Sequence, residues 1–324
     1  MQGKEASEQE TKAKSSVGID VSKCWLDIHV LPSNERLRVT NDCAGIRQLK
    51  RWLARFDIAL AAIEATGKWH RHVQRSLVAS GIPTAAVDPF RVRMFAKAQG
   101  ILAKTDRLDA RVLALFAAVM DPSVRAPAPQ IMAELAELVV ARAVEAQVAL
   151  KNQVCTADGK FLKRQLERRL GRASKDIAEL ESEILKRIKT DNSLAKRYTI
   201  LTSIPSFGFA VAATLLACLA EIGSTTAKQI AMLAGLAPIA DQSGERDGLR
   251  VIWGGRPIVR RILYLAALSA TRFNADMKSF YKRLREHGKP PKVALIAVAR
   301  KLVVLANTLI TEDRNWQPRS PKHA

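Results

Sequence analysis

Short runs in which apolar and polar residues alternate mark the beginning of the chain. Residues 17–20, residues 25–30 and Arg36–Thr40 predict three strands joined by short turns, the arrangement of an antiparallel meander. A helix over residues 41–56 should follow, because Asn41-Asp42 can cap it and its apolar residues recur at helical spacing. This segment therefore predicts an antiparallel meander followed by one helix.

Helices and strands alternate after the meander. Ile58–Glu64 is almost wholly apolar, which is typical of a strand buried on both faces in a parallel sheet. A helix over 69–80, a short strand over 83–87 and two helices over 89–99 and 106–119 are predicted next. Strands followed by alternating helices and strands indicate an α/β domain with a mixed sheet.

The strand pattern stops at a proline-rich segment, residues 121–130, which predicts a linker. Residues 132–154 and 161–188 predict two long helices, the second with apolar residues three and four apart, as in an antiparallel helix pair or coiled coil. The chain is predicted to be helical again from about residue 197. A polar, glycine-rich loop over 237–255 should interrupt these later helices, which include 230–236, 256–271 and 293–310.

These elements predict a chain of the α/β plus all-α class. We expect a disordered leader at 1–14, a mixed-sheet domain at 15–125 and a long helical arm at 126–195. A helical C-terminal domain should occupy 196–314, followed by a tail at 315–324.

Composition indicates the class of partner. Hydrophobic residues make up 48% of the chain, enough for a core, but 52 Lys and Arg against 31 Asp and Glu leave a net charge of +21. Such an excess favours a polyanionic partner, with nucleic acid ahead of an anionic membrane surface. The four cysteines are scattered, which argues against a zinc site and fits a reducing cytoplasm. Residues 198–220 are long enough to span a membrane, but Pro205 and Gly208 favour a loop and a buried helix.

Four acids fall where sites form in open α/β folds. Asp20 ends the first predicted strand, Glu64 ends the buried strand, and Asp106 and Asp109 open a helix. Oxygen ligands of this kind suit Mg²⁺ or Mn²⁺, and two such ions can stabilise the entering and leaving oxygens of a phosphoryl transfer. Each acid alone also fits a capping or exposed-end role, so both interpretations stay open at this point.

Several short motifs resemble those of one family. VGIDVSK at the first strand, IEATG at 63–67 and KTDRLDA at 104–110 are similar to the signature of IS110-family transposases. GLAP at 235–238, Ser243-Gly244, the GG-x₄-R pattern ending at Arg260 and the LYLAALSA that follows resemble that family's C-terminal domain. The family's catalytic domain is similar to the RuvC resolvase, with a ribonuclease-H-like fold and an Asp-Glu-Asp-Asp set.

The resemblance implies different catalytic roles for the two halves of the chain. Asp20, Glu64, Asp106 and Asp109 would bind Mg²⁺ or Mn²⁺, and Ser243 would attack a DNA phosphate to form a phosphoserine link. Basic residues near these motifs are candidates for holding nucleic acid: Lys104, Arg107, Arg246, Arg250, Arg256 and Arg260.

The resemblance also implies partners. These would be donor and target DNA and a structured noncoding RNA, with no membrane, in a homodimer or homotetramer at the nucleoid of a prokaryotic cytoplasm. The basic run at 160–172 is either a solvated face or a phosphate contact.

Two alternatives and one departure remain. The alternatives to a serine recombinase are a metal-dependent, RuvC-like junction nuclease without serine chemistry and a non-catalytic nucleic-acid-binding protein. Ser206 stands where the family usually has a second glycine after the proline, next to a turn that resembles a helix-hairpin-helix element. That substitution bears on how closely nucleic acid can approach the turn.

Overall fold

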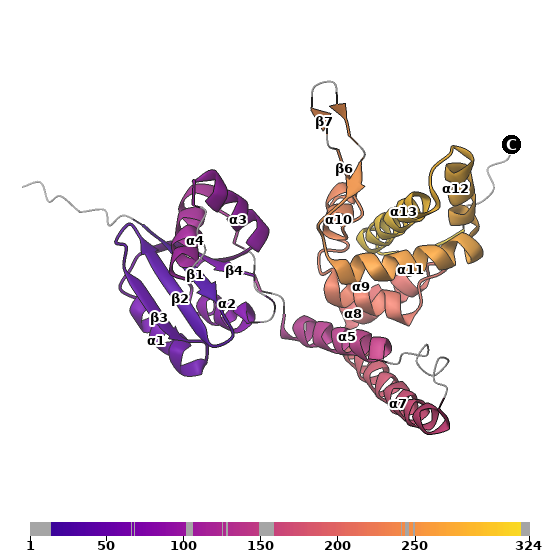
Figure 1. The fold of residues 1–324 in the computed structure, drawn as a ribbon, viewed down its shortest axis with the longest axis horizontal. Helices are drawn as coiled ribbons and strands as arrows, with labels where there is room; N and C mark the ends of the chain where they lie inside the picture. Colours follow the sequence, from indigo (N-terminus) through magenta and orange to yellow (C-terminus); the bar gives the residue numbers. More distant parts are fainter. Residues whose placement is uncertain are drawn as a thin grey trace, which may run out of the picture. The chain divides into compact units, whose positions relative to one another are not determined.

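The chain divides into two compact units, Met1–Pro127 and Ala128–Ala324, and the division falls within the proline-rich segment 121–130. The structure is a computed structural model. It describes residues 14–318 except 66, 68, 102–105, 125, 128, 149–158, 241, 244–245 and 249, and it describes 106–108, 143–148, 242–243 and 246–247 by their backbone alone. Figure 1 shows a sheet with helices in the first unit and mainly helices in the second.

A five-stranded mixed sheet lies at the centre of the first unit (Figure 1). In spatial order the strands are β3 (Arg36–Thr40), β2 (Trp25–Leu31), β1 (Ser15–Val21), β4 (Ile58–Glu64) and β5 (Thr84–Val87). β2 is antiparallel to both β1 and β3, whereas β4 is parallel to β1 and to β5. The mixed α/β fold and the antiparallel start predicted from the sequence are confirmed.

Helices cover both faces of this sheet. One core contains Val17, Ile19 and Ile63 with residues of α1 (Cys43–Leu53) and α2 (His70–Val78). A second core contains Leu60 and Ala62 with residues of α3 (Pro89–Ala98) and α4 (Asp106–Met120). Alternation along β1 and β4 explains this division, because successive side chains point to opposite faces.

Gly18 allows α4 to lie directly on β1. A Cβ atom at Gly18 would lie 2.1 Å from the carbonyl oxygen of Ala110 and 2.3 Å from the backbone nitrogen of Ala114. No side chain fits in that space, so the helix backbone touches the strand backbone. This contact fixes the height of α4 above the sheet and therefore the position of its first turn.

Helices make up most of the second unit. α5 (Gln130–Val148) packs on α7 (Lys160–Thr190). α5 also contacts α9 (Phe209–Cys218), and α7 also contacts α8 (Asn192–Thr202). The others are α10 (Ala227–Leu233), α11 (Pro257–Phe273), α12 (Ala275–Glu286) and α13 (Pro291–Thr311). One hydrophobic core joins them, with α13 in contact with α8, α10, α11 and α12.

The helix α13 passes a test of length and apolar composition for a membrane span, the one helix to do so within the described part of the chain. In the structure it belongs to the core, and Ala299, Leu302 and Ala306 are fully buried. The segment 198–220 forms the end of α8, a turn and the short buried helix α9, as the sequence predicted. Core packing therefore accounts for the apolar composition of both segments.

Two segments differ from the sequence prediction. The predicted loop at 237–255 contains two small antiparallel pairs: β6 (Pro238–Ile239) with β9 (Val251–Ile252), and β7 (Gln242–Ser243) with β8 (Arg246–Asp247). We call β6 to β9 the β arm, and Figure 1 shows it standing out from the helices near α10. The stretch between α11 and α13 also forms a helix, α12, which was not predicted from the sequence.

Candidate active site and nucleic-acid interface

Asp20 and Glu64 lie on adjacent parallel strands. Ile19 of β1 is in register with Ile63 of β4, so the two acids follow one residue later on each strand. Both point to the face that carries Gly18 and Ala62, which is the face covered by α3 and α4. The sheet therefore places two carboxylates side by side near the carboxyl ends of these strands.

The helix α4 adds a third carboxylate to this region. Asp109 directly precedes Ala110, whose carbonyl contacts Gly18, and Asp109 and Glu64 line the same cavity of about 330 Å³. Arg93 of α3 lines this cavity too. The backbone of Asp106 begins α4 one turn before Ala110. The side chains of Asp106 and Arg107, and the whole of Lys104, lie outside the described residues.

The donor chemistry of this edge fits a divalent cation. Asp20, Glu64 and Asp109 offer carboxylate oxygens, the ligands that Mg²⁺ and Mn²⁺ prefer, and Asp106 would add a fourth. Among the side chains that the structure describes, no three from His, Cys, Asp or Glu form a group that could hold a metal ion. The described residues thus bring the acids to one edge without assembling a finished metal centre.

Asp27 and Arg38 extend this edge and were missed in the sequence. Asp27 lies opposite Asp20 in the β1–β2 register, and Arg38 lies opposite Asp27 in the β2–β3 register. Asp27 is buried and forms an ion pair with Arg38, in which Nη2 of Arg38 lies 3.0 Å from Oδ2 of Asp27. The charged row Arg38, Asp27, Asp20, Glu64 therefore crosses four strands on one face. Alternation in β2 was the available signal, because it places Asp27 on an inward-facing position.

His29 is buried beneath α4, two residues further along β2. It lies opposite Gly18 in the register and only 1% of its side chain is exposed. Neither ring nitrogen has a hydrogen-bond partner among the described residues. Burial lowers the pKa of His29, the side chain of Asn34 opposes part of this shift, and the charges of Arg36 and Arg111 lower the pKa further. The imidazole is therefore held neutral inside the face that carries the acids.

The β arm presents Ser243 on a hairpin. Ser243 of β7 pairs with Arg246 of β8, and the β6–β9 pair forms the base below them. The structure describes Ser243 and Arg246 by their backbone only, whereas Arg250, between β8 and β9, has an exposed side chain. The register thus places a basic residue directly across the hairpin from the serine.

Arg256 and Arg260 have partners inside the second unit. Arg256 donates two hydrogen bonds of 2.6 Å to the two carboxylate oxygens of Glu221 and one of 3.0 Å to the carbonyl of Cys218. Arg260 donates to the carbonyl of Gly254 at 2.6 Å. These contacts give both arginines structural partners within the unit. A nucleic-acid role stays a prediction for all six basic residues: Lys104, Arg107, Arg246, Arg250, Arg256 and Arg260.

The glycines of the GLAP and GG-x₄-R motifs meet at the base of the β arm. Gly235, Gly254 and Gly255 all have positive φ angles, at 68°, 70° and 63°. A Cβ atom at Gly255 would lie 2.2 Å from the backbone nitrogen of Gly235. The backbones of the two motifs therefore cross in close contact. Arg260 holds this crossing by donating a hydrogen bond to the carbonyl of Gly254. This crossing anchors the arm that carries Ser243.

Ser206 keeps a glycine-like conformation in the turn before α9. Its φ angle is 85°, in the left-handed region that favours glycine, and its hydroxyl is buried without a partner among the described residues. The departure from the family's pattern therefore leaves the turn in place, at the cost of local strain. Gly208 then caps α9, with its backbone in an extended conformation.

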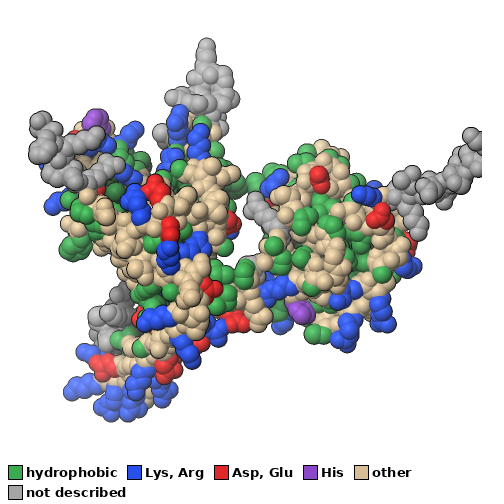
Figure 2. Space-filling view, turned by 180° about the vertical axis from the view of Figure 1, so that it is seen from behind, with side chains coloured by type: hydrophobic (Ala, Val, Ile, Leu, Met, Phe, Trp, Pro, Cys, Tyr) green, Lys and Arg blue, Asp and Glu red, His purple; other side chains and the backbone are tan. Residues whose placement is uncertain are grey.

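Basic side chains gather on α7. The six Lys and Arg residues of the run 160–172 are all exposed, and Figure 2 shows Lys and Arg side chains clustered at the lower end of the second unit. Phe161 and Leu162 beside them are also exposed, at 73% and 53%. A solvated charged face does not require exposed apolar residues, so this end of α7 has the composition of an interaction surface.

Comparisons with known proteins agree with both halves of the structure. A family model described as "Transposase" matches residues 17–157, and one described as "Transposase IS116/IS110/IS902 family" matches residues 198–282. The chain is 27% identical over 319 residues to the pilin gene-inverting protein of Moraxella bovis, covering 95% of this chain and 99% of that protein. The same name, identity and coverage apply to a protein of Moraxella lacunata.

A shorter match covers part of an insertion-element protein. The IS900 uncharacterized 42 kDa protein of Mycobacterium paratuberculosis is 28% identical over 160 residues, which is 46% of this chain and 39% of that protein. The family matches, the full-length relatives and the mixed sheet with its acidic edge lead to one conclusion. The chain belongs to the IS110 family of transposases and is a DNA transposase or recombinase.

Proposed function

We propose that this transposase cuts and rejoins DNA through a covalent bond between Ser243 and a DNA phosphate, while the acidic edge of the sheet holds Mg²⁺ or Mn²⁺. One observation carries the proposal: Asp20 and Glu64 sit on adjacent strands of one face, and Asp109 shares a cavity with Glu64. In a family that breaks DNA bonds, carboxylates gathered in this way support a role in phosphoryl transfer.

In the proposed step the hydroxyl oxygen of Ser243 attacks the phosphorus of a DNA phosphodiester. A bond from that oxygen to phosphorus forms as the bond to one sugar oxygen breaks. The serine proton passes to a carboxylate of the acidic edge, directly or through water, and the departing sugar oxygen takes up a proton. The number of phosphate ester bonds is unchanged, so attack by a second sugar hydroxyl rejoins DNA without an added energy source.

The chain's own residues would divide the remaining tasks. Asp20, Glu64, Asp106 and Asp109 would hold the divalent metal, which when bound would stabilise negative charge on the phosphate. Arg246, across the hairpin from Ser243, and the exposed Arg250 are placed to hold phosphate near the serine. Arg256 is less suited to this task, because both of its terminal nitrogens already bind Glu221.

The proposed substrates are donor and target DNA, with a structured noncoding RNA as a further partner. The excess of positive charge and the exposed run on α7 support nucleic acid in general. Two full-length relatives are named for inverting a pilin gene, which supports rejoining of DNA over cleavage alone. The exposed Phe161 and Leu162 support α7 as a contact between copies in a homodimer or homotetramer.

Ser243→Ala tests the proposed nucleophile. The assay uses a reporter plasmid that carries the DNA sequences flanking the gene for this transposase. We expect its recombination to fall by a factor of about 10³ or more, because removal of the nucleophile abolishes the covalent route. Ser279→Ala is a matched control, since Ser279 is an exposed serine of α12 that lies outside the proposed machinery. Its recombination should equal that of the unmodified protein.

The same variant separates recombination from simple hydrolysis. Denatured protein from a reaction should carry nucleotide attached to Ser243, detected by mass spectrometry after nuclease digestion. Cleavage that persists in Ser243→Ala, with no attached nucleotide in the unmodified protein, would overturn the serine step and favour the junction-nuclease alternative.

A further inference from the structure

A groove of about 750 Å³ runs between α13 and the base of the β arm. One wall is a stripe of α13 formed by Val293, Ile296, Arg300 and Val304, spaced three or four residues apart. The opposite wall is formed by the β6–β9 pair, including Ile252. The other sides of α13 are buried in the core, so this stripe is the face that the helix leaves open.

The floor of the groove is apolar where a solvated helix face would be polar. Val293 is 52% exposed and Val251 is 57% exposed. Ile296, which also lines the groove, is half-buried. Contiguous exposed apolar surface of this kind marks a place where another molecule binds. The groove therefore needs an occupant with an apolar surface.

The rim of the groove is cationic. Four basic side chains line it, Arg250, Lys292, Arg300 and Lys301, and its described lining contains no acid. Lys301 lies 4.3 Å from the ring centroid of Phe280, which also lines the groove. Arg250, Lys292 and Arg300 form no ion pair with any carboxylate in the described part of the chain. The occupant must therefore carry negative charge beside its apolar surface.

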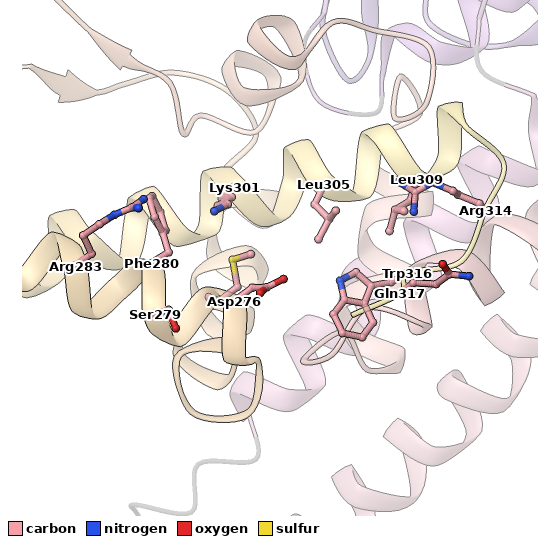
Figure 3. A pocket seen from close by; sticks show the side chains of 11 residues that line it. Asp276, Ser279, Phe280, Arg283, Lys301, Leu305, Leu309, Arg314, Trp316 and Gln317 are labelled. Carbon is pink, nitrogen blue, oxygen red and sulfur yellow. The ribbon is translucent and has the colours of Figure 1, made fainter. Parts of the chain in front are cut away.

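A neighbouring cavity lacks this combination. It has a volume of about 540 Å³ and shares Phe280 and Lys301 with the groove (Figure 3). It also contains the carboxylate of Asp276, and the chain's own Trp316 lines it. Of these two sites, the groove is therefore the one that combines a rim of basic side chains with an open apolar floor.

We propose that this groove binds an unpaired nucleotide of the nucleic-acid partner, with the base against α13 and the phosphates on Arg250, Lys292 and Arg300. An unpaired strand offers both required surfaces, because its phosphates are anionic and its base faces are apolar and exposed. A duplex hides those faces by stacking. Arg250 also follows the hairpin that carries Ser243 in sequence and lines the groove, so the groove begins beside the base of that hairpin. This inference rests on the proposed function for the identity of the partner.

Affinity for a fluorescein-labelled oligothymidine tests the site in the full chain. Val293→Asp should weaken binding about tenfold, the effect of losing one base contact. Arg300→Glu should weaken it by a similar factor, because it removes a phosphate contact and adds a repelling charge. Leu265→Asp is the matched apolar control, because Leu265 is 54% exposed on α11 and lies outside the groove. Lys278→Glu, at an exposed position on α12, is the matched charge control. Both controls should bind the oligothymidine within about twofold of the unmodified chain.

Two further measurements decide what occupies the groove. An oligonucleotide containing 5-iodouracil should cross-link to Phe280 or to α13, and Val293→Asp should leave affinity for a blunt duplex unchanged. Equal loss of single-strand and duplex binding, or cross-links that map elsewhere, would overturn the proposal. So would unchanged oligothymidine binding together with a change in oligomeric mass, which would make the groove a contact between copies. Oligothymidine affinity does not depend on any covalent step, so failure of the serine chemistry would not imitate failure of the groove.

Discussion

At the scale of single residues, Arg38 and Asp27 change the electrostatics of the acidic edge. Asp27 places a further carboxylate next to Asp20, and like charges this close repel each other unless a cation offsets them. Arg38 supplies that cation from the outermost strand at 3.0 Å. The edge therefore carries its own counter-charge beside the carboxylates.

His29 makes the stability of the first unit depend on pH. Burial holds its folded-state pKa below the ordinary value of 6.5, so the unfolded chain binds a proton that the folded chain excludes. This contribution is complete above pH 6.5 and is lost as the pH falls below that value. We expect the free energy of unfolding to fall by up to about 1.4 kcal/mol per pH unit in this window.

Urea unfolding measured by circular dichroism between neutral and mildly acidic pH checks this dependence. His29→Leu should flatten the slope, because leucine does not titrate. His287→Gln is the control, since His287 is exposed at the end of α12 and should leave the slope unchanged. An equal slope in His29→Leu and the unmodified chain would show that other groups govern the acid sensitivity.

At the scale of elements, the contact of α4 with β1 positions the candidate site. Gly18→Ala should destabilise the first unit by about 1–3 kcal/mol, because its Cβ would meet backbone atoms of α4 that cannot rotate away. The same shift would displace Asp109 from Glu64, so recombination should fall as well. Denaturant unfolding and the plasmid assay measure the two effects.

Gly171→Ala provides the matched comparison. Gly171 lies within α7, and a Cβ there meets no atom within 4 Å. Alanine should therefore be neutral or stabilise the helix by up to about 1 kcal/mol. Wild-type stability in Gly18→Ala would contradict the close contact between α4 and β1.

Local pattern predicted the elements whose periodicity is strong. Arg36–Thr40 and Ile58–Glu64 form strands with the bounds that alternation and apolar composition predicted. α12 was missed although Met277, Phe280 and Tyr281 recur at helical spacing, because half of its residues are charged and they obscure this short stripe. The strands of the β arm are two residues long, too short to show any period.

Placement of the acids could be predicted only in part. Parallel strands place Asp20 and Glu64 at one edge, and this follows from the apolar run of β4. Asp27 and Arg38 join the row through pairing across β2 and β3, which depends on the register of two turns. The structural roles of Arg256 and Arg260 depend on contacts with Glu221 and Gly254, and no local pattern in the sequence shows them.

At the scale of the whole molecule, the chain combines two units that are built differently. The first has a mixed sheet with an acidic edge, and the second has a helical core from which the β arm projects. The proposed chemistry needs both, because a serine hydroxyl is a weak nucleophile until a base or a metal activates it. The central claim is therefore that the carboxylates of the first unit act on the phosphate that Ser243 attacks.

The most direct test is the yield of nucleotide attached to Ser243 when the acidic edge is altered. Glu64→Gln keeps the shape of the side chain and removes its charge, and Asp176→Asn makes the same kind of change at an exposed position of α7. We expect attached nucleotide at Ser243 in the unmodified protein and in Asp176→Asn, with none detectable by mass spectrometry in Glu64→Gln. Attachment at the unmodified level in Glu64→Gln would contradict the central claim.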